Sequence, residues 1–158
     1  MGSWFLALEQ SGLGDAMRSS SVLYPFANVL HIVGLCFFFG AIAIMDARLI
    51  GAFTSMPLKP FVSRWRRLAV AAFVIQIVSG FMLFSAEASA IVENPVFRNK
   101  MILIALGLAN VAVFELVTKR EVAQTGSGHP PLAARVSGVV SLGIWTLVAV
   151  AGRLIAYF

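Results

Sequence analysis

Charged side chains are scarce in this sequence of 158 residues. Asp, Glu, Lys and Arg make up only 12% of it, whereas hydrophobic residues make up 59%. A soluble domain of this length has too small an interior to bury so much apolar surface. The scarcity of charge therefore excludes a soluble domain and indicates an integral membrane protein. The net charge of +5 is assigned to membrane topology and not to a nucleic-acid partner, because the basic residues cluster between apolar runs.

Cysteine and the common catalytic motifs are also lacking. The single cysteine, Cys36, excludes an internal disulfide. The sequence contains no glycine-rich nucleotide loop, no nucleophile elbow and no paired-histidine metalloprotease motif. Nothing in it therefore favours hydrolysis or phosphoryl transfer, and whether the protein is an enzyme stays open.

Four apolar runs are each long enough to cross a bilayer. We expect transmembrane helices at about 25–53, 68–88, 99–119 and 136–157, because only a helix satisfies every backbone polar group within one such segment. The residues before them lack the basic and apolar regions of a signal peptide. We expect an amphipathic helix at about 3–20 on the membrane surface, anchored by Trp4 and Phe5. The predicted fold is all-α: an integral membrane four-helix bundle with an N-terminal interfacial amphipathic helix, in one domain of residues 1–158.

The connections between the apolar runs predict the orientation. Lysine and arginine are concentrated in the first and third connections, whereas acidic and basic residues balance in the second. By the positive-inside rule, the first and third connections are cytoplasmic. We therefore expect a multi-pass protein of a bacterial inner membrane with both termini in the periplasm. The basic residues concerned are Lys59, Arg64, Arg66, Arg67, Lys119, Arg120 and Arg135.

His31 is the only histidine within an apolar run. It lies six residues into the first predicted helix, about 9 Å below the outer boundary. Ala27, His31 and Gly34 share one face of that helix, and small residues beside a histidine leave room for a flat macrocycle. At the same depth we expect residues 80–82, 104–107 and 149–152 of the other three helices.

This layer suggests a b-type haem. His31 is then the axial ligand, and Asn28 orients its ring. The propionates need basic partners, and the cations expected above this layer are Arg98, Lys100 and Arg153. The predicted function is a small haem b protein for electron transfer or haem handling.

Two other hypotheses remain open. An imidazole and thioethers also suit copper(I), and we consider a copper-binding or transport protein that uses His31 with Met82 and Met101, Met17 lying on the same side. Histidine, methionine and small residues are, however, also ordinary packing groups at membrane helix interfaces. The third hypothesis is therefore a non-catalytic subunit of a membrane complex or a homo-oligomer. Its docking faces are the stripes Ala105 with Ala109 and Ser137 with Ser141.

Polar residues near mid-membrane are few. Gln76, Ser79 and Gly80 share one face of the second predicted helix. We expect Gln76 to form a hydrogen bond with Asn110 of the third helix.

Asp46 and Arg48 end the first apolar run near the cytoplasmic boundary. They are two residues apart and so do not face each other on a helix. Near the boundary we expect both to reach toward water and to form structural ion pairs. Glu115 is the expected partner, either for Arg48 or, at a spacing of four, for Lys119.

Several stretches of the chain resemble those of known membrane protein families. The stretches "HIVG", "DARLIG", "SGFMLFSAEA" and "NPVFRNK" resemble an uncharacterised bacterial family of short four-helix inner-membrane proteins, over roughly Trp4 to Glu115. More loosely, the chain is similar to the copper-resistance D membrane proteins and to the membrane protoporphyrinogen oxidase family. Those proteins carry a histidine early in one helix and a lysine that opens a later one. The resemblance implies that His31 and Lys100 form a functional pair, with haem b or copper as the ligand.

Overall fold

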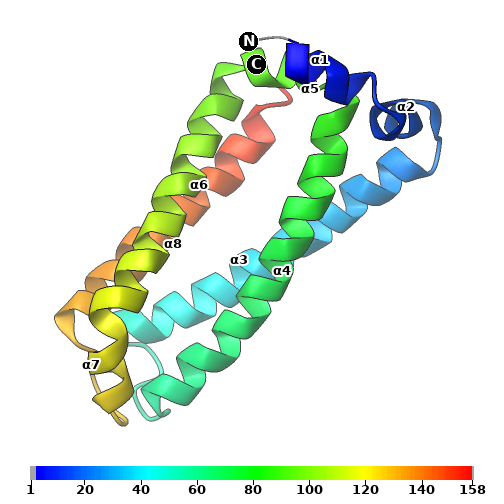
Figure 1. The fold of residues 1–158 in the computed structure, drawn as a ribbon. Helices are drawn as coiled ribbons and strands as arrows, with labels where there is room; N and C mark the ends of the chain where they lie inside the picture. Colours follow the sequence, from blue (N-terminus) through cyan, green and yellow to red (C-terminus); the bar gives the residue numbers. More distant parts are fainter. Residues whose placement is uncertain (1–2, 158) are drawn as a thin grey trace.

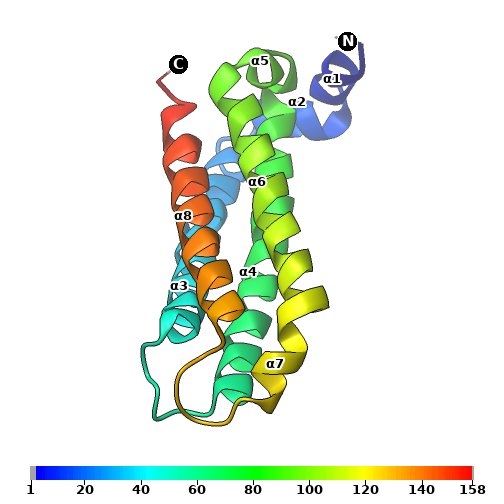
Figure 2. The same cartoon turned by 90° about the vertical axis from the view of Figure 1, so that its left-hand side faces the viewer.

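The computed structural model describes residues 3–157, and these are helical with no strand. Four helical segments are long and apolar enough to cross a membrane (Figure 1). They are α3 (Leu23–Ile50), α4 (Leu58–Ala86), the continuous segment Pro95–Gln124, and α8 (Leu132–Leu154). The expected all-α membrane fold is therefore confirmed, and the chain is a multi-pass membrane protein. Helix α1 and the end of α8 lie at the same end of the molecule (Figures 1 and 2).

The third spanning segment is not a uniform α-helix. It consists of α6 (Pro95–Val113), one π-helical turn, η1 (Phe114–Thr118), and α7 (Lys119–Gln124). The Asn94 side chain caps its start by accepting hydrogen bonds from two backbone N–H groups, and Pro95 occupies the first turn. Single π-helical turns are rare and are frequent at functional sites.

The N-terminal region forms two short helices where one was expected. They are α1 (Ser3–Glu9) and α2 (Gly12–Ser19), separated by Ser11, whose side chain caps α2. The Glu9 carboxylate accepts hydrogen bonds from the N–H group of Ser89 at 3.0 Å and from its hydroxyl at 2.5 Å. These bonds favour the charged form and lower the pKa of Glu9 from its usual value. They hold α1 against α5 (Ala88–Glu93), at the end of α4 (Figure 2).

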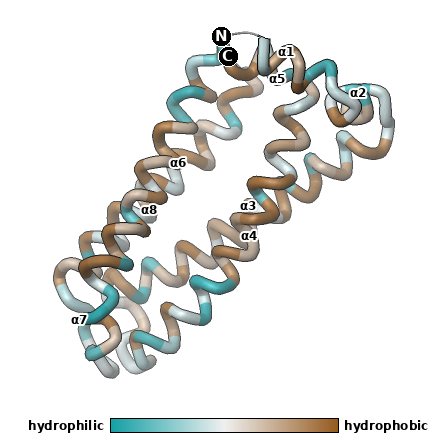
Figure 3. Tube along the Cα trace, in the orientation of Figure 1, coloured by the Kyte–Doolittle hydropathy of each residue, from teal (hydrophilic) through white to brown (hydrophobic). Residues whose placement is uncertain are grey.

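The helices extend beyond the apolar runs that predicted them. Helix α4 begins at Leu58, not near residue 68, and the third segment continues to Gln124. The basic residues from Lys59 to Arg67 therefore lie on a helix and not in a loop. Hydropathy shows where the lipid-facing part of a helix ends. The helix itself can extend further into water, because its backbone hydrogen bonds do not require an apolar surface. Figure 3 shows the result: hydrophobic residues dominate the middle of the long helices, and hydrophilic ones gather toward their ends.

The four spanning segments are arranged as two packed pairs. Helix α3 packs along α4, α6 packs along α8, and contacts between α3 and α8 join the two pairs. The backbones of α4 and α6 hardly approach each other within residues 3–157, although the rings of Phe84 and Phe97 stack with centroids 5.4 Å apart. At the crossing of α3 and α4, a Cβ atom added to Gly34 would lie 2.8 Å from Nε2 of Gln76. A larger residue at position 34 would therefore force the Gln76 side chain, and Ile75 beside it, to shift.

Asp46 and Arg48 are fully buried, with 1% and 0% of their surfaces exposed. The expectation that they reach toward water is wrong. The Arg48 guanidinium instead turns into the protein, where it donates hydrogen bonds to the backbone carbonyls of Met56 at 2.8 Å and Gly128 at 3.2 Å. It thus ties the loop after α3 to the loop before α8.

Candidate functional site

The His31 ring is oriented by Ser79 of the neighbouring helix. Its Nδ1 atom lies 2.9 Å from the Ser79 hydroxyl oxygen, which in turn donates to the carbonyl of Ile75 at 2.6 Å. A carbonyl oxygen can only accept, so the hydroxyl hydrogen is committed to Ile75. The hydroxyl oxygen must then accept from Nδ1–H of His31. The other ring nitrogen, Nε2, is left unprotonated with a free lone pair.

Helix α4 also supports the position of the ring in two other ways. A Cβ atom added to Gly80 would lie 3.2 Å from Cε1 of His31, so the imidazole rests against this glycine. One turn away, the Gln76 amide donates to the backbone carbonyl of His31 at 2.5 Å. The expected bond between Gln76 and Asn110 is wrong, because Asn110 pairs with the backbone carbonyl of Ser137 at 3.1 Å.

Lys100 of α6 forms no hydrogen bond with His31 within residues 3–157, and its charge acts on the ring only through space. Its ammonium group packs beside Gly152 of α8, where an added Cβ atom would lie 3.4 Å from Nζ. Within residues 3–157, no side-chain hydrogen bond or ion pair is found for Lys100. All four spanning segments therefore contribute to one group of residues, which we call the His31 site: His31, Ser79, Gly80, Lys100 and Gly152.

The other predicted haem partners lie outside this group. Asn28 is exposed on α3, and the His31 ring forms its hydrogen bond with Ser79 instead. Arg98 is exposed and donates to the carbonyl of Val92 at 2.9 Å. Arg153 is also exposed, and it donates to the hydroxyl of Tyr157 at 2.8 Å. The sequence places Ser79 and Gly80 on one face of the helix, but no pattern in it indicates that Ser79 binds the ring.

The methionines expected to bind copper differ in burial and do not form one group. Met17 is 1% exposed and packs with Ala27, and Met82 packs against the same cluster. Met101 is 42% exposed on α6. Among the described residues, no three His, Cys, Asp or Glu side chains form a group suited to a metal ion. A copper site would therefore rest on His31 and thioethers alone.

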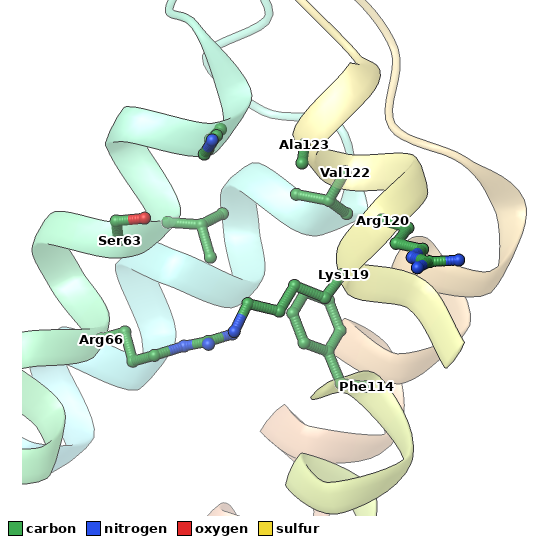
Figure 4. A pocket seen from close by; sticks show the side chains of 9 residues that line it. Ser63, Arg66, Phe114, Lys119, Arg120, Val122 and Ala123 are labelled. Carbon is green, nitrogen blue, oxygen red and sulfur yellow. The ribbon is translucent and has the colours of Figure 1, made fainter. Parts of the chain in front are cut away.

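A basic pocket of about 270 Å³ lies between the start of α4 and α7 (Figure 4). Glu115 in its vicinity forms ion pairs with Arg66 and, at 2.7 Å, with Lys119. The expected pairing with Lys119 is confirmed, and that with Arg48 is wrong. Figure 4 shows the Arg66 and Lys119 side chains extending toward each other beside the ring of Phe114. Glu115 thus offsets part of the positive charge at this end of the bundle.

Comparison with known proteins identifies the family. Residues 4–158 match "Family of unknown function (DUF6644)", and the chain belongs to this family. A search of curated proteins and a search of solved structures found no match. The function must therefore be argued from the chemistry of the His31 site.

Proposed function

We propose that the chain is a small b-type haem protein that transfers electrons or handles haem. The observation that carries the proposal is the state of the His31 ring. Its Nδ1–H group is held by Ser79, and its Nε2 atom is free. A histidine that binds a metal usually donates its second ring N–H group to a neighbouring acceptor, which fixes the ring and its tautomer. His31 has this arrangement.

The residues around His31 fit the requirements of a haem. A haem b needs an axial nitrogen, small or apolar neighbours along its faces, and a cation for its propionates. His31 supplies the nitrogen, and Lys100 supplies an ammonium group that has no protein partner in the described structure. Gly80 makes room for the imidazole ring of His31 itself. A bound haem would supply one-electron redox chemistry. The chain would orient the ligand through Ser79 and neutralise a propionate through Lys100.

The proposal includes an orientation in a bacterial inner membrane. The basic start of α4 and helix α7 lie together at the end opposite α1 (Figures 1 and 3). The positive-inside rule assigns this basic end to the cytoplasm. Both termini then lie in the periplasm, and His31 lies in the outer half of the membrane. Electrons or haem would thus be handled near the periplasmic surface.

The test is a titration of the purified apoprotein in detergent with haemin, followed by the growth of a Soret band. We expect saturation at one haem per chain for the natural protein and loss of saturable binding for His31→Ala. The matched control is His129→Ala, which removes the only other histidine, an exposed one in the loop before α8. Equal binding by all three proteins, or no saturable binding by any, would refute the proposal.

A further inference from the structure

A second cavity lies in the centre of the bundle, apart from the His31 site. It has a volume of about 140 Å³, and all four spanning segments contribute to its walls. Most of the lining side chains are apolar, among them Phe38 of α3, Phe73 of α4 and Leu108 of α6. We call this cavity the central pocket.

Two buried polar atoms on its lining residues have no hydrogen-bond partner. They are Oδ2 of Asp46 and Nε1 of Trp145, on side chains that are 1% and 3% exposed. Native proteins leave very few buried polar atoms unpaired, so two at one cavity point to a partner outside the chain. Ser141 of α8 lines the same pocket as Asp46 and Trp145.

The central pocket reaches the lipid-facing surface between α4 and α6. The backbones of these two helices hardly approach each other, and the stacked rings of Phe84 and Phe97 join them near the end that carries α1. Val70 of α4 and Leu108 and Val111 of α6 line the pocket and are also 57%, 46% and 39% exposed. A molecule dissolved in the bilayer can therefore enter from the side without crossing polar surface.

The size and walls of the pocket favour a flat ring. An apolar cavity of about 150 Å³ in another protein binds benzene, so 140 Å³ admits one six-membered ring. Three aromatic side chains surround the space. The ring centroids of Phe38 and Phe73 lie 4.7 and 5.8 Å from that of Trp145, both edge-on. Such an arrangement offers further aromatic contacts to a ring placed among them.

We propose that the central pocket binds the head group of a membrane-soluble quinone or quinol. The ring carries oxygen atoms on opposite edges. One accepts a hydrogen bond from Nε1–H of Trp145. The other accepts from the protonated Asp46 carboxyl group in the quinone, or, as a hydroxyl in the quinol, donates to the Asp46 carboxylate. The apolar tail leaves between α4 and α6 into the lipid. This inference does not depend on the proposed haem, because none of these residues belongs to the His31 site.

The test uses tryptophan fluorescence, since quinones quench a nearby indole. The chain has three tryptophans, and Trp4→Phe with Trp65→Phe leaves only Trp145 in the pocket. The matched control is Trp4→Phe with Trp145→Phe, which leaves Trp65, a residue that does not line the pocket. Both proteins are titrated with decylubiquinone in lipid nanodiscs. We expect saturable quenching of Trp145 and only linear quenching of Trp65.

Two further measurements test the role of the oxygen atoms. Asp46→Leu, made in the protein that keeps Trp145, should weaken decylubiquinone binding about tenfold, the effect of losing one hydrogen bond. Decylbenzene, which has the ring and tail but no oxygen, should not displace the quinone. If Trp145 is quenched no more than Trp65, the pocket holds water or a lipid chain and the proposal fails. If decylbenzene displaces the quinone equally well, the pocket recognises only an apolar ring, and the proposal also fails. The comparison of the two single-tryptophan proteins decides the matter even if Asp46→Leu does not fold.

Discussion

Replacing Arg48 with methionine should release the loop between α3 and α4 from the loop between α7 and α8. The Arg48 guanidinium binds the carbonyls of Met56 at 2.8 Å and Gly128 at 3.2 Å. Hydrogen bonds from a charged donor contribute about 1.5–3 kcal/mol each, so their gross loss is about 3–6 kcal/mol. Methionine keeps the apolar stem, and both carbonyls belong to partly exposed loop residues that water can reach. We therefore expect a net loss of about 2 kcal/mol, which corresponds to a factor of about 30 in an equilibrium constant.

Hydrogen exchange measures this loss locally. The loops are also joined by two backbone hydrogen bonds, from the amide of Gly128 to Thr54 and from that of Leu58 to Gly126. In Arg48→Met, exchange of these two amides should become about 30-fold faster, because it reports the opening of the loops. Exchange in the middle of α3 should not change. The exposed Arg135→Met serves as the control. Unchanged exchange at Gly128 and Leu58 would show that the backbone bonds alone hold the loops, and would refute the role given to Arg48.

Three further predictions follow from other contacts. Ser79→Ala keeps the His31 ligand but removes the acceptor that orients it, so haemin affinity should fall about 10- to 100-fold; an unchanged affinity in the Soret titration would contradict this. The amide shift of Ser89 in a nuclear magnetic resonance titration should report a midpoint below the usual value for Glu9, 4.5. Because the pKa of Glu9 is lowered in the folded state, its stabilisation of α1 is present above the usual pKa and is lost as the pH falls through the lowered pKa. Glu9→Gln should abolish the titration of the Ser89 amide shift, and a midpoint at or above the usual value would contradict the prediction. In a background without the native cysteine, Ser127→Cys should react with an impermeant maleimide only after the cells are lysed, and labelling of intact spheroplasts would reverse the proposed orientation.

The sequence predicts the number of spanning helices but not where each helix begins and ends. Long apolar runs correctly indicate four spanning helices, because a bilayer requires a helix of that length. The same runs misplace the start of α4 at about 68, since hydropathy ends at the lipid boundary while the helix begins at Leu58. The break between α1 and α2 was also missed. It depends on the side chain of Ser11 capping α2 and not on any change in hydropathy.

At the His31 site, the sequence predicts the depth of the residues in the membrane but not which way their side chains face. Counting depth at about 1.5 Å per residue placed Gly80 level with His31, and the structure brings the two into contact. Depth does not determine the rotation of a helix about its axis. For helices that are apolar almost all round, no polar face indicates that rotation. This is why the roles of Ser79 and the burial of Asp46 could not be predicted, although Ser79 shares a face with Gly80.

The most direct test of the central claim is a reduced-minus-oxidised visible spectrum of the protein purified from haem-replete cells. We predict a Soret band and an α band of a b-type haem in the natural protein and in His129→Ala, and their loss or displacement in His31→Ala. A featureless spectrum in the natural protein, or the same bands in His31→Ala, would contradict the assignment of His31 as a haem ligand.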